Sequence, residues 1–147
     1  MIVNNSTGFK LISIIGYGTF ITRNLWRDKK NVEICTVKNF TRIYPKNSWF
    51  PYVLRSGGSF KALKFDVNEE ELETLDRIEG VFEGLFKRLN TEIYLKNDQK
   101  ASAFIYVPTD KTIKSQNLFL EIDKTDRWKE EIKKYSEIVK NFPELIS

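Results

Sequence analysis

The order of apolar patterns along the chain restricts the folds open to it more than any other feature. Segments typical of β-strands follow one another with one short amphipathic helix among them, and a second helical pattern stands near the C-terminal end. Successive parallel strands need a crossover of a dozen or more residues, usually a helix. Long crossovers of this kind are missing from the pattern, so it favours an α+β fold over a doubly wound sheet. We expect a small curled or closed mixed β-barrel, flanked by a short helix and a C-terminal helix.

Three strand patterns stand in the first half of the chain. Residues 11–15 form a nearly continuous apolar run that ends at Gly16, which is typical of a buried strand leading into a turn. Residues 32–40 mix β-branched and polar side chains and are also expected to form a strand. In residues 59–67, apolar and charged side chains alternate, so this strand is expected to bury one face.

The second half contains a hairpin pattern. Residues 89–95 alternate between apolar and polar side chains, residues 97–100 have the composition of a turn, and residues 101–107 supply a second strand. The earlier apolar segment 49–54 contains Pro51, which favours an edge strand or a loop over a central strand. Its aromatic residues fit core packing as well as the wall of a pocket.

The clearest helix begins after Asn68. Asn68 is a favourable N-cap, and Glu71 follows three residues later, as in a capping box. Gly80 is typical of the residue that ends a helix. A narrow apolar stripe runs along this helix through Leu72, Leu75 and Ile78.

A final helix is expected to begin near Thr125 and to end at Pro143. Its expected apolar face consists of Trp128, Ile132, Tyr135, Val139 and Phe142.

The length and the cysteine content suggest one intracellular domain. A chain of 147 residues is long enough for one hydrophobic core, and we expect a single domain over residues 1–147. Residues 1–7 are polar and do not resemble a signal peptide, and no apolar run is long enough to cross a bilayer. Cys35 is the only cysteine, which fits a reducing compartment such as the cytoplasm. We therefore expect a cytoplasmic protein without a membrane partner.

The charges are spread along the sequence. The formal net charge is +4, and 20 Asp and Glu residues are interspersed among 24 Lys and Arg residues. This pattern is typical of solvated faces, and no basic stripe or zinc-finger spacing supports nucleic-acid binding. Binding of nucleic acid through a basic surface is kept as an alternative, and it would be salt-sensitive.

The sequence contains no histidine, which excludes several kinds of chemistry within this chain. Ser-His-Asp and Cys-His catalysis are excluded, and so are zinc sites of the usual Cys/His types. Proton transfer is left to Asp, Glu, Lys, Tyr, Cys35 and the amino terminus.

Glu79 is a candidate proton carrier because of its place at the carboxyl end of the predicted helix. The negative end of the helix dipole disfavours an ionised carboxylate there, and Asp76 adds a like charge one turn back. A carboxyl group with a raised pKa suits a proton shuttle near neutral pH. Arg77 would offset part of this effect. The alternative interpretation is a surface glutamate at a frayed helix end.

The segment Tyr17-Gly18-Thr19-Phe20 is a candidate binding turn. A strand that turns sharply exposes successive backbone N–H groups, which bind a carboxylate or an oxyanion. Gly18 would let a ligand approach the backbone closely. The alternative interpretation is an ordinary tight turn after a buried strand.

These two motifs, in this order, resemble the gamma-glutamylcyclotransferase-like family. That family has Tyr-Gly-Ser/Thr-Leu where residues 17–20 read Tyr-Gly-Thr-Phe, and Leu-Asp-x-x-Glu-Gly, which residues 75–80 match at each defined position. The resemblance covers nearly the whole chain. Further matching segments are residues 58–67, residues 85–88, residues 103–107, and the segment from Asp126 and Trp128 to Tyr135.

The resemblance implies an enzyme that needs no metal and no organic cofactor. It places Glu79 at the catalytic acid/base position and Gly18, Thr19 and Phe20 in the turn whose backbone holds the amino-acid end of a glutamyl group. Tyr17 would lie against the same pocket. The implied substrate is a small γ-glutamyl compound, and the implied products are 5-oxoproline and a free amine.

Two departures from the family pattern leave a second interpretation open. Phe86 stands where the family usually has tyrosine, and the spacing at residues 82–84 is unusual. The domain could therefore be a non-catalytic binding or scaffold module with a vestigial pocket. The sequence does not specify the amine or the oligomeric state.

Overall fold

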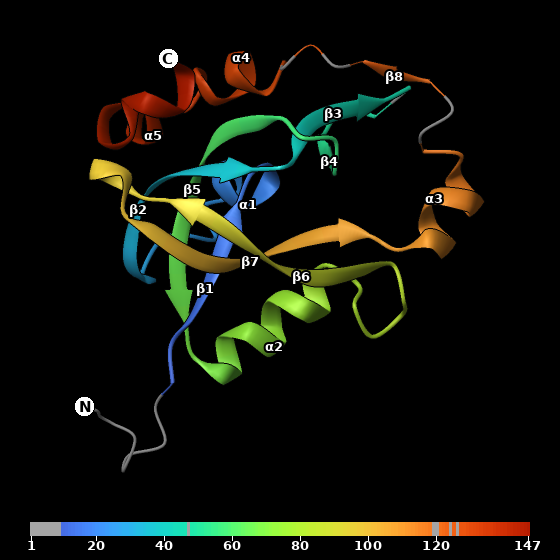
Figure 1. Cartoon of the computed structure of the whole chain (residues 1–147), viewed down its shortest axis with the longest axis horizontal. Coiled ribbons are helices and arrows are strands. Elements are labelled where there is room, and N and C mark those ends of the chain that lie inside the picture. The colour runs from blue at the N-terminus through green and yellow to red at the C-terminus, as the bar shows by residue number, and fades with distance from the viewer. Residues whose placement is uncertain (1–9, 47, 119–120, 124, 126) are drawn as a thin grey trace.

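Five strands close into a barrel in the computed structural model, which describes residues 10–46, 48–118, 121–123, 125 and 127–147. The order around the barrel is β1-β5-β2-β6-β7 (Figure 1). Every neighbouring pair is antiparallel except β1 and β7, which run parallel and close the barrel. The mixed barrel expected from the sequence is therefore confirmed. Its strands are β1 (Ile12–Gly16), β2 (Lys30–Lys38), β5 (Ser59–Val67), β6 (Phe86–Tyr94) and β7 (Lys100–Pro108).

The predicted hairpin is formed by β6 and β7. Its register runs without interruption from Phe86 opposite Pro108 to Tyr94 opposite Lys100. The connection contains a single 3₁₀ turn, η1 (Lys96–Asp98), in which Asn97 has a φ of 68°. Asparagine adopts this left-handed conformation more readily than most residues, so the local sequence suits the turn.

A second sheet of three strands lies beside the barrel in the order β4-β3-β8. Strand β4 (Tyr52–Leu54) is an edge strand that begins directly after Pro51, in agreement with the sequence. The central strand β3 (Thr41–Pro45) and the short β8 (Ile122–Asp123) were not expected from the sequence.

Helix α2 (Glu69–Ile78) has the predicted capping box. The Asn68 side-chain oxygen accepts a hydrogen bond from the Glu71 amide at 2.8 Å, and the Glu71 carboxylate accepts one from the Asn68 amide at 2.9 Å. Gly80 follows the helix with a φ of +71°. A Cβ at Gly80 would lie 2.8 Å from a Leu85 methyl carbon, so the loop after α2 packs where a larger residue would clash.

The C-terminal segment is helical but is divided into two helices. The sequence predicted one helix through residue 142, whereas Tyr135 has φ −111° and ψ 89° and separates α4 (Trp128–Ile132) from α5 (Ser136–Asn141). The break turns α5 so that Ile138, rather than Val139, is fully buried. Asp126, part of a segment that resembles the family pattern, lies outside the described residues, as do residues 1–7. The remaining elements are α1 (Thr19–Thr22), α3 (Asp110–Gln116) and η2 (Pro143–Ile146).

Two hydrophobic clusters lie on the two faces of the barrel strands. One cluster contains helix residues such as Leu72 of α2 and Trp128 of α4, so it fills the space between the barrel and its helices. Figure 1 shows α2 on one side of the barrel and α4 and α5 on the other. The second cluster contains strand residues and their flanks but no helix residue, and we assign it to the barrel interior. Its members include the small side chains Cys35, Ala62 and Ala103.

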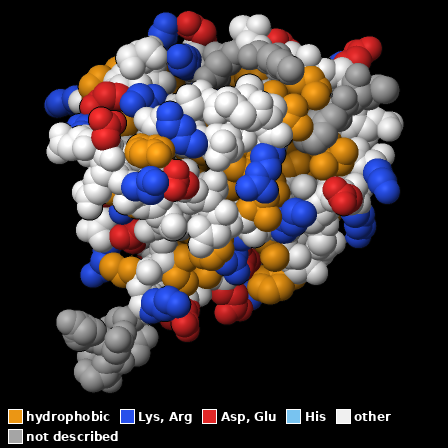
Figure 2. All heavy atoms as spheres, viewed as in Figure 1, with side chains coloured by type: hydrophobic (Ala, Val, Ile, Leu, Met, Phe, Trp, Pro, Cys, Tyr) orange, Lys and Arg blue, Asp and Glu red, His pale blue; other side chains and the backbone are white. Residues whose placement is uncertain are grey.

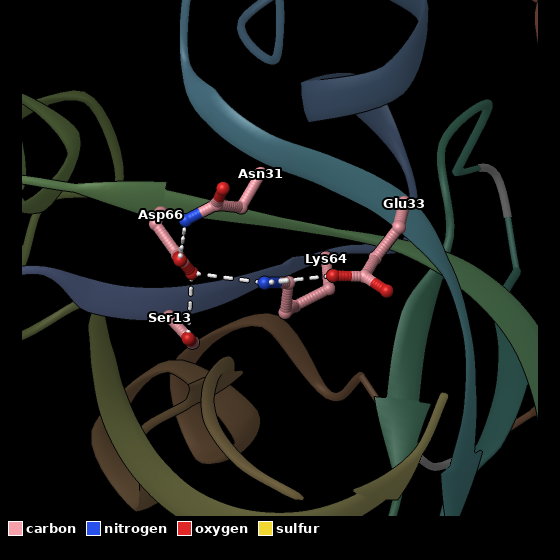
Figure 3. Close-up of polar contacts among 5 residues, drawn as sticks. All are labelled: Ser13, Asn31, Glu33, Lys64 and Asp66. Carbon is pink, nitrogen blue, oxygen red and sulfur yellow. Dashed lines mark hydrogen bonds and ion pairs between the residues drawn. The ribbon is translucent and has the colours of Figure 1, made fainter. Parts of the chain in front are cut away.

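The barrel interior continues into a polar cluster, drawn in Figure 3. Lys64 lies between Asp66, at 3.2 Å, and Glu33, at 3.1 Å. Asp66 also accepts hydrogen bonds from Ser13, at 2.6 Å, and from the Asn31 amide group, at 2.7 Å. Because side chains alternate along a strand, Ser13, Lys64 and Asp66 share the inward face of the apolar interior residues.

The outer surface carries charges of both signs. On the face in Figure 2, Lys and Arg side chains are interspersed with Asp and Glu, and small hydrophobic areas lie between them. Surface pairs such as Arg77 with Glu73, at 2.7 Å, join neighbouring charges. Among the described residues, no helix has the length and apolar character needed to cross a membrane.

Candidate active site

One cavity of about 620 Å³ lies where the end of β1, the start of α1 and the C-terminal end of α2 meet. It brings Glu79 together with all four residues of the predicted turn, Tyr17 to Phe20, although they are far apart in the sequence. The rest of its wall comes from Arg23, residues 49–52, residues 77, 78 and 80, Glu83, residues 85 and 86, and Tyr106.

Glu79 is the C-cap residue of α2, with φ −84° and ψ −1°, and its side chain is partly buried. Burial raises the pKa of Glu79 from 4.5 to about 7, and the Arg23 guanidinium acts in the opposite direction. Glu79 is therefore neither a fully solvated surface carboxylate nor an ordinary ion-pair member. Close to neutral pH, a carboxyl group of this kind exists in both protonation states.

Asp76 does not act on Glu79 in the way that the sequence suggested. Its buried carboxylate accepts a hydrogen bond from the Tyr106 hydroxyl at 2.6 Å and pairs with Arg88 at 2.9 Å. Burial, rather than a second carboxylate, is the cause of the raised pKa of Glu79. Asp76 instead fixes Tyr106, a wall residue of the cavity to which the sequence pattern assigned no role.

The turn is held by contacts to its backbone and to Tyr17. The Tyr17 hydroxyl donates to the Tyr106 carbonyl at 2.9 Å, and Arg42 donates to the Tyr17 carbonyl at 2.7 Å. A Cβ at Gly18 would lie 2.9 Å from Pro51 Cγ. A side chain at this position would collide with the ring of Pro51, which accounts for the glycine.

The backbone amides at the start of α1 differ in whether they have a hydrogen-bond acceptor within the protein. The Gly18 carbonyl accepts hydrogen bonds from the Ile21 and Thr22 amides, at 2.9 and 3.4 Å. The preceding amides, of Thr19 and Phe20, have no intramolecular acceptor among the described residues. They are therefore available to a ligand that carries an acceptor, such as a carboxylate.

Three tyrosines lie close enough to Glu79 to respond to its charge. Burial raises the pKa of Tyr17, Tyr52 and Tyr106, and the Glu79 carboxylate adds to the increase in each case. Hydrogen bonding to Asp76 raises the pKa of Tyr106 further. All three side chains are therefore neutral phenols at physiological pH.

An aromatic wall completes the cavity, and the sequence did not distinguish it from core packing. Phe86 stacks on Tyr52 with ring centroids 5.8 Å apart and an interplanar angle of 14°. The ring centroids of Phe50 and Tyr52 lie 5.3 Å apart. Phe86, where the family usually has tyrosine, thus serves as an apolar wall residue. The described residues contain no group of three or more His, Cys, Asp or Glu side chains that could hold a metal ion.

Comparison with solved structures finds proteins of the same fold. A solution structure from Arabidopsis thaliana is 24% identical, with a TM-score of 0.61 over 95% of this chain and 93% of that one. An AIG2-like protein from Mus musculus is 20% identical, with a TM-score of 0.57 over 78% and 86% of the two chains. A yeast gamma-glutamyl cyclotransferase specific to glutathione is 8% identical, with a TM-score of 0.56 over 84% and 86%. At these identities the likeness establishes the fold alone.

The sequence itself matches a family model. Comparison with the curated proteins gives no match. The model described as gamma-glutamyl cyclotransferase, AIG2-like, matches residues 14–130. This range contains all the residues that line the cavity. The chain therefore belongs to the gamma-glutamyl cyclotransferase, AIG2-like family.

Proposed function

We propose that this protein is a gamma-glutamyl cyclotransferase that releases 5-oxoproline and a free amine from a small γ-glutamyl amide. The observation that carries the proposal is that Glu79, with a pKa of about 7, lines the same cavity as the turn from Tyr17 to Phe20. A carboxyl group with this pKa can accept a proton and return it within one turnover.

The reaction is an intramolecular acyl transfer. The substrate's α-ammonium group loses a proton to the Glu79 carboxylate, and the resulting amine attacks the γ-carbonyl carbon. The bond between that carbon and the leaving nitrogen then breaks as Glu79 returns the proton to that nitrogen. Overall the α-nitrogen loses two protons, one to Glu79 and one to solvent, and the leaving amine gains two, one from Glu79 and one from solvent, so the reaction needs no further reagent. Because the nucleophile is tethered, the protein mainly has to fold the substrate and move protons.

The turn has the complementary task of holding the glutamyl group. The free amides of Thr19 and Phe20 suit the α-carboxylate of the substrate. Tyr17, fixed by its hydrogen bond to Tyr106, forms a neutral wall beside them. With the carboxylate bound at one end, the α-amine and the γ-carbonyl would meet near Glu79. We place the reaction in the cytoplasm, since Cys35 is buried and free.

The test is release of 5-oxoproline from a panel of γ-glutamyl amines and dipeptides without added metal. Glu79→Gln keeps the shape of the side chain and removes the proton carrier, so it should lower kcat by roughly 10²- to 10⁴-fold. Glu70→Gln is the matched control, because Glu70 is an exposed glutamate of the same helix that does not line the cavity. It should retain the wild-type rate.

Two outcomes would contradict the proposal. Turnover by Glu79→Gln at the wild-type rate would place the proton carrier elsewhere. Absence of 5-oxoproline from the whole panel would favour the alternative, a binding or scaffold module with a vestigial pocket.

A further inference from the structure

Exposed hydrophobic side chains gather at the mouth of the cavity. Five large hydrophobic side chains of the described residues are exposed, and three of them, Trp49, Ile78 and Leu85, line this one cavity. Trp49 is 71% exposed, more than any other member of the set. Exposed apolar groups that gather around a pocket mark a surface that binds an apolar ligand.

Trp49 extends the aromatic wall of the cavity outward. Its ring lies 5.2 Å from Phe50, edge to face, and 6.4 Å from the fully buried Trp128. The wall then continues inward through Phe50, Tyr52 and Phe86, whose successive centroids are 5.3 and 5.8 Å apart. The rings thus form a continuous apolar surface from the mouth to the vicinity of Glu79.

The cavity is also larger than a glutamyl group requires. A volume of about 620 Å³ lies in the range of pockets that enclose drug-sized ligands. The glutamyl part of a substrate would be held at the turn and at Glu79. The remaining space, along the aromatic wall, is left for the amine part.

We propose that the amine part of the preferred substrate carries an aromatic ring that lies against Trp49, Phe50 and Phe86. This inference rests on the proposed function and names the substrate class of the same site. Aromatic rings pack edge to face or offset against such a wall with a gain beyond their buried area. A small or strongly polar amine would leave the wall exposed to water.

The amine part can be a free aromatic amine or an aromatic amino acid, because the charges at the cavity are mixed. Arg23, Arg77 and Glu83 all line it, and Arg77 is paired with Glu73 at 2.7 Å. Both sources share the ring, and comparing γ-glutamyl-phenethylamide with γ-glutamyl-phenylalanine distinguishes them.

The test compares γ-glutamyl-phenethylamide with γ-glutamyl-ethylamide, which lacks the ring. We expect kcat/KM to be at least about tenfold higher for the phenethylamide, since even one methylene group in an apolar pocket changes specificity by this factor. Trp49→Ala should reduce the ratio by roughly fivefold, whereas Trp49→Phe should keep most of it. Leu11→Ala is the matched control, an exposed apolar residue outside the cavity, and should leave the ratio unchanged.

Three results would overturn the inference: equal kcat/KM for the two amides, a preference for glutathione, or a Trp49→Ala variant that lowers both values equally. Calorimetric binding to the Glu79→Gln protein separates this failure from failure of the proposed function. If no amide yields 5-oxoproline but the phenethylamide binds about tenfold more tightly than the ethylamide, the catalytic proposal fails and the aromatic subsite is supported. Equal or absent binding overturns the subsite as well.

Discussion

The pKa of Glu79 is raised by burial of its side chain and not by a nearby negative charge. Among the described residues the nearest acidic side chain along the helix, Asp76, is committed to Arg88 and Tyr106. Burial alone raises the pKa of Glu79, and Arg23 lowers it. Burial in a cavity lined by neutral phenols therefore suffices to bring the pKa of this carboxyl group close to neutral pH.

The first prediction at this scale concerns pH and rate. If Glu79 must be ionised to accept the substrate proton, kcat/KM should fall as the pH drops below about 7. The chain has no histidine, so a side-chain ionisation in this range points to a carboxyl group. Removing the opposing charge with Arg23→Gln should move the acid limb to higher pH. A pH–rate profile of both proteins, paired with an NMR titration of Glu79, measures this. A limb near 4.5, or one unmoved by Arg23→Gln, would contradict the assignment.

The second prediction concerns stability. The pKa of Glu79 is about 7 in the folded protein and about 4.5 in the unfolded chain. Between these values the folded state binds a proton that the unfolded state lacks, so the free energy of unfolding falls as the pH rises through this window. Glu79→Gln should therefore be more stable than the wild type at pH 8, by about 3 kcal/mol, and similar to it at pH 4. Urea unfolding at both pH values decides this, and equal stability at pH 8 would argue against a buried, raised carboxyl group.

At the scale of the element, α2 and the loop after it hold Glu79 at the cavity. Gly80 has a positive φ and would clash with Leu85 if it carried a Cβ, whereas Gly84 has a φ of +73° and open space within 4 Å of where its Cβ would stand. Gly84→Ala should thus cost about 1 kcal/mol, from backbone conformation alone. Gly80→Ala should cost more and should also lower kcat/KM, because Leu85 lines the cavity.

Urea unfolding and steady-state kinetics of the two alanine variants test this prediction. The Gly84→Ala variant is the control, because its loss of stability comes from the backbone conformation alone. Equal losses of stability and activity in the two proteins would show that the contact between residue 80 and Leu85 does not position the loop.

The elements that the sequence predicted well are those defined by local signals. The capping box of Asn68 and Glu71 and the β6–β7 hairpin depend on residues close in the chain, and both form as expected. The break at Tyr135 was missed because it is set by burial of Ile138 against the rest of the fold rather than by a Pro or Gly. Strand β3 was missed because four of its five residues are buried, including Arg42, so its sequence lacks the alternation of a strand with one exposed face.

The candidate site shows the same difference between local sequence signals and contacts that depend on the whole fold. The order of the Tyr17 turn and the Glu79 motif was sufficient to name both as candidates, and the fold places them on one cavity. The links from Asp76 to Tyr106 and from Tyr17 to Tyr106 join residues 30 and 89 positions apart. Contacts of that kind depend on how the barrel closes, so periodicity and spacing along the chain do not reveal them.

At the scale of the whole molecule, the barrel interior is divided between an apolar part and the polar cluster of Figure 3. Lys64 and Asp66 are 6% and 8% exposed, and alternation along β5 turns both inward. The alternation in residues 59–67 predicted one buried face, whereas both faces of β5 are buried from Ala62 to Val67. Closure of the barrel encloses Lys64 and Asp66, while the face of Leu63, Phe65 and Val67 packs against the helices.

The polar cluster gives the last prediction, that stability and activity are separable in this barrel. Lys64→Met would leave Asp66 buried with Ser13 and Asn31 but without its cation, and breaking a buried pair in this way costs about 3 kcal/mol. Lys64 stands opposite Ile15, two residues before Tyr17, but its ammonium group lies against Asp66, which stands opposite Ser13 and farther from the turn, so the cavity should keep its shape. Urea unfolding should therefore show the loss of stability, while kcat/KM at a temperature where the variant is folded stays within about twofold of wild type.

Lys61→Met, an exposed lysine of the same strand, is the control and should change neither quantity measurably. A Lys64→Met protein as stable as wild type would mean that the cluster is solvated rather than enclosed, and a matching loss of kcat/KM would mean that the interior and the cavity act as one unit.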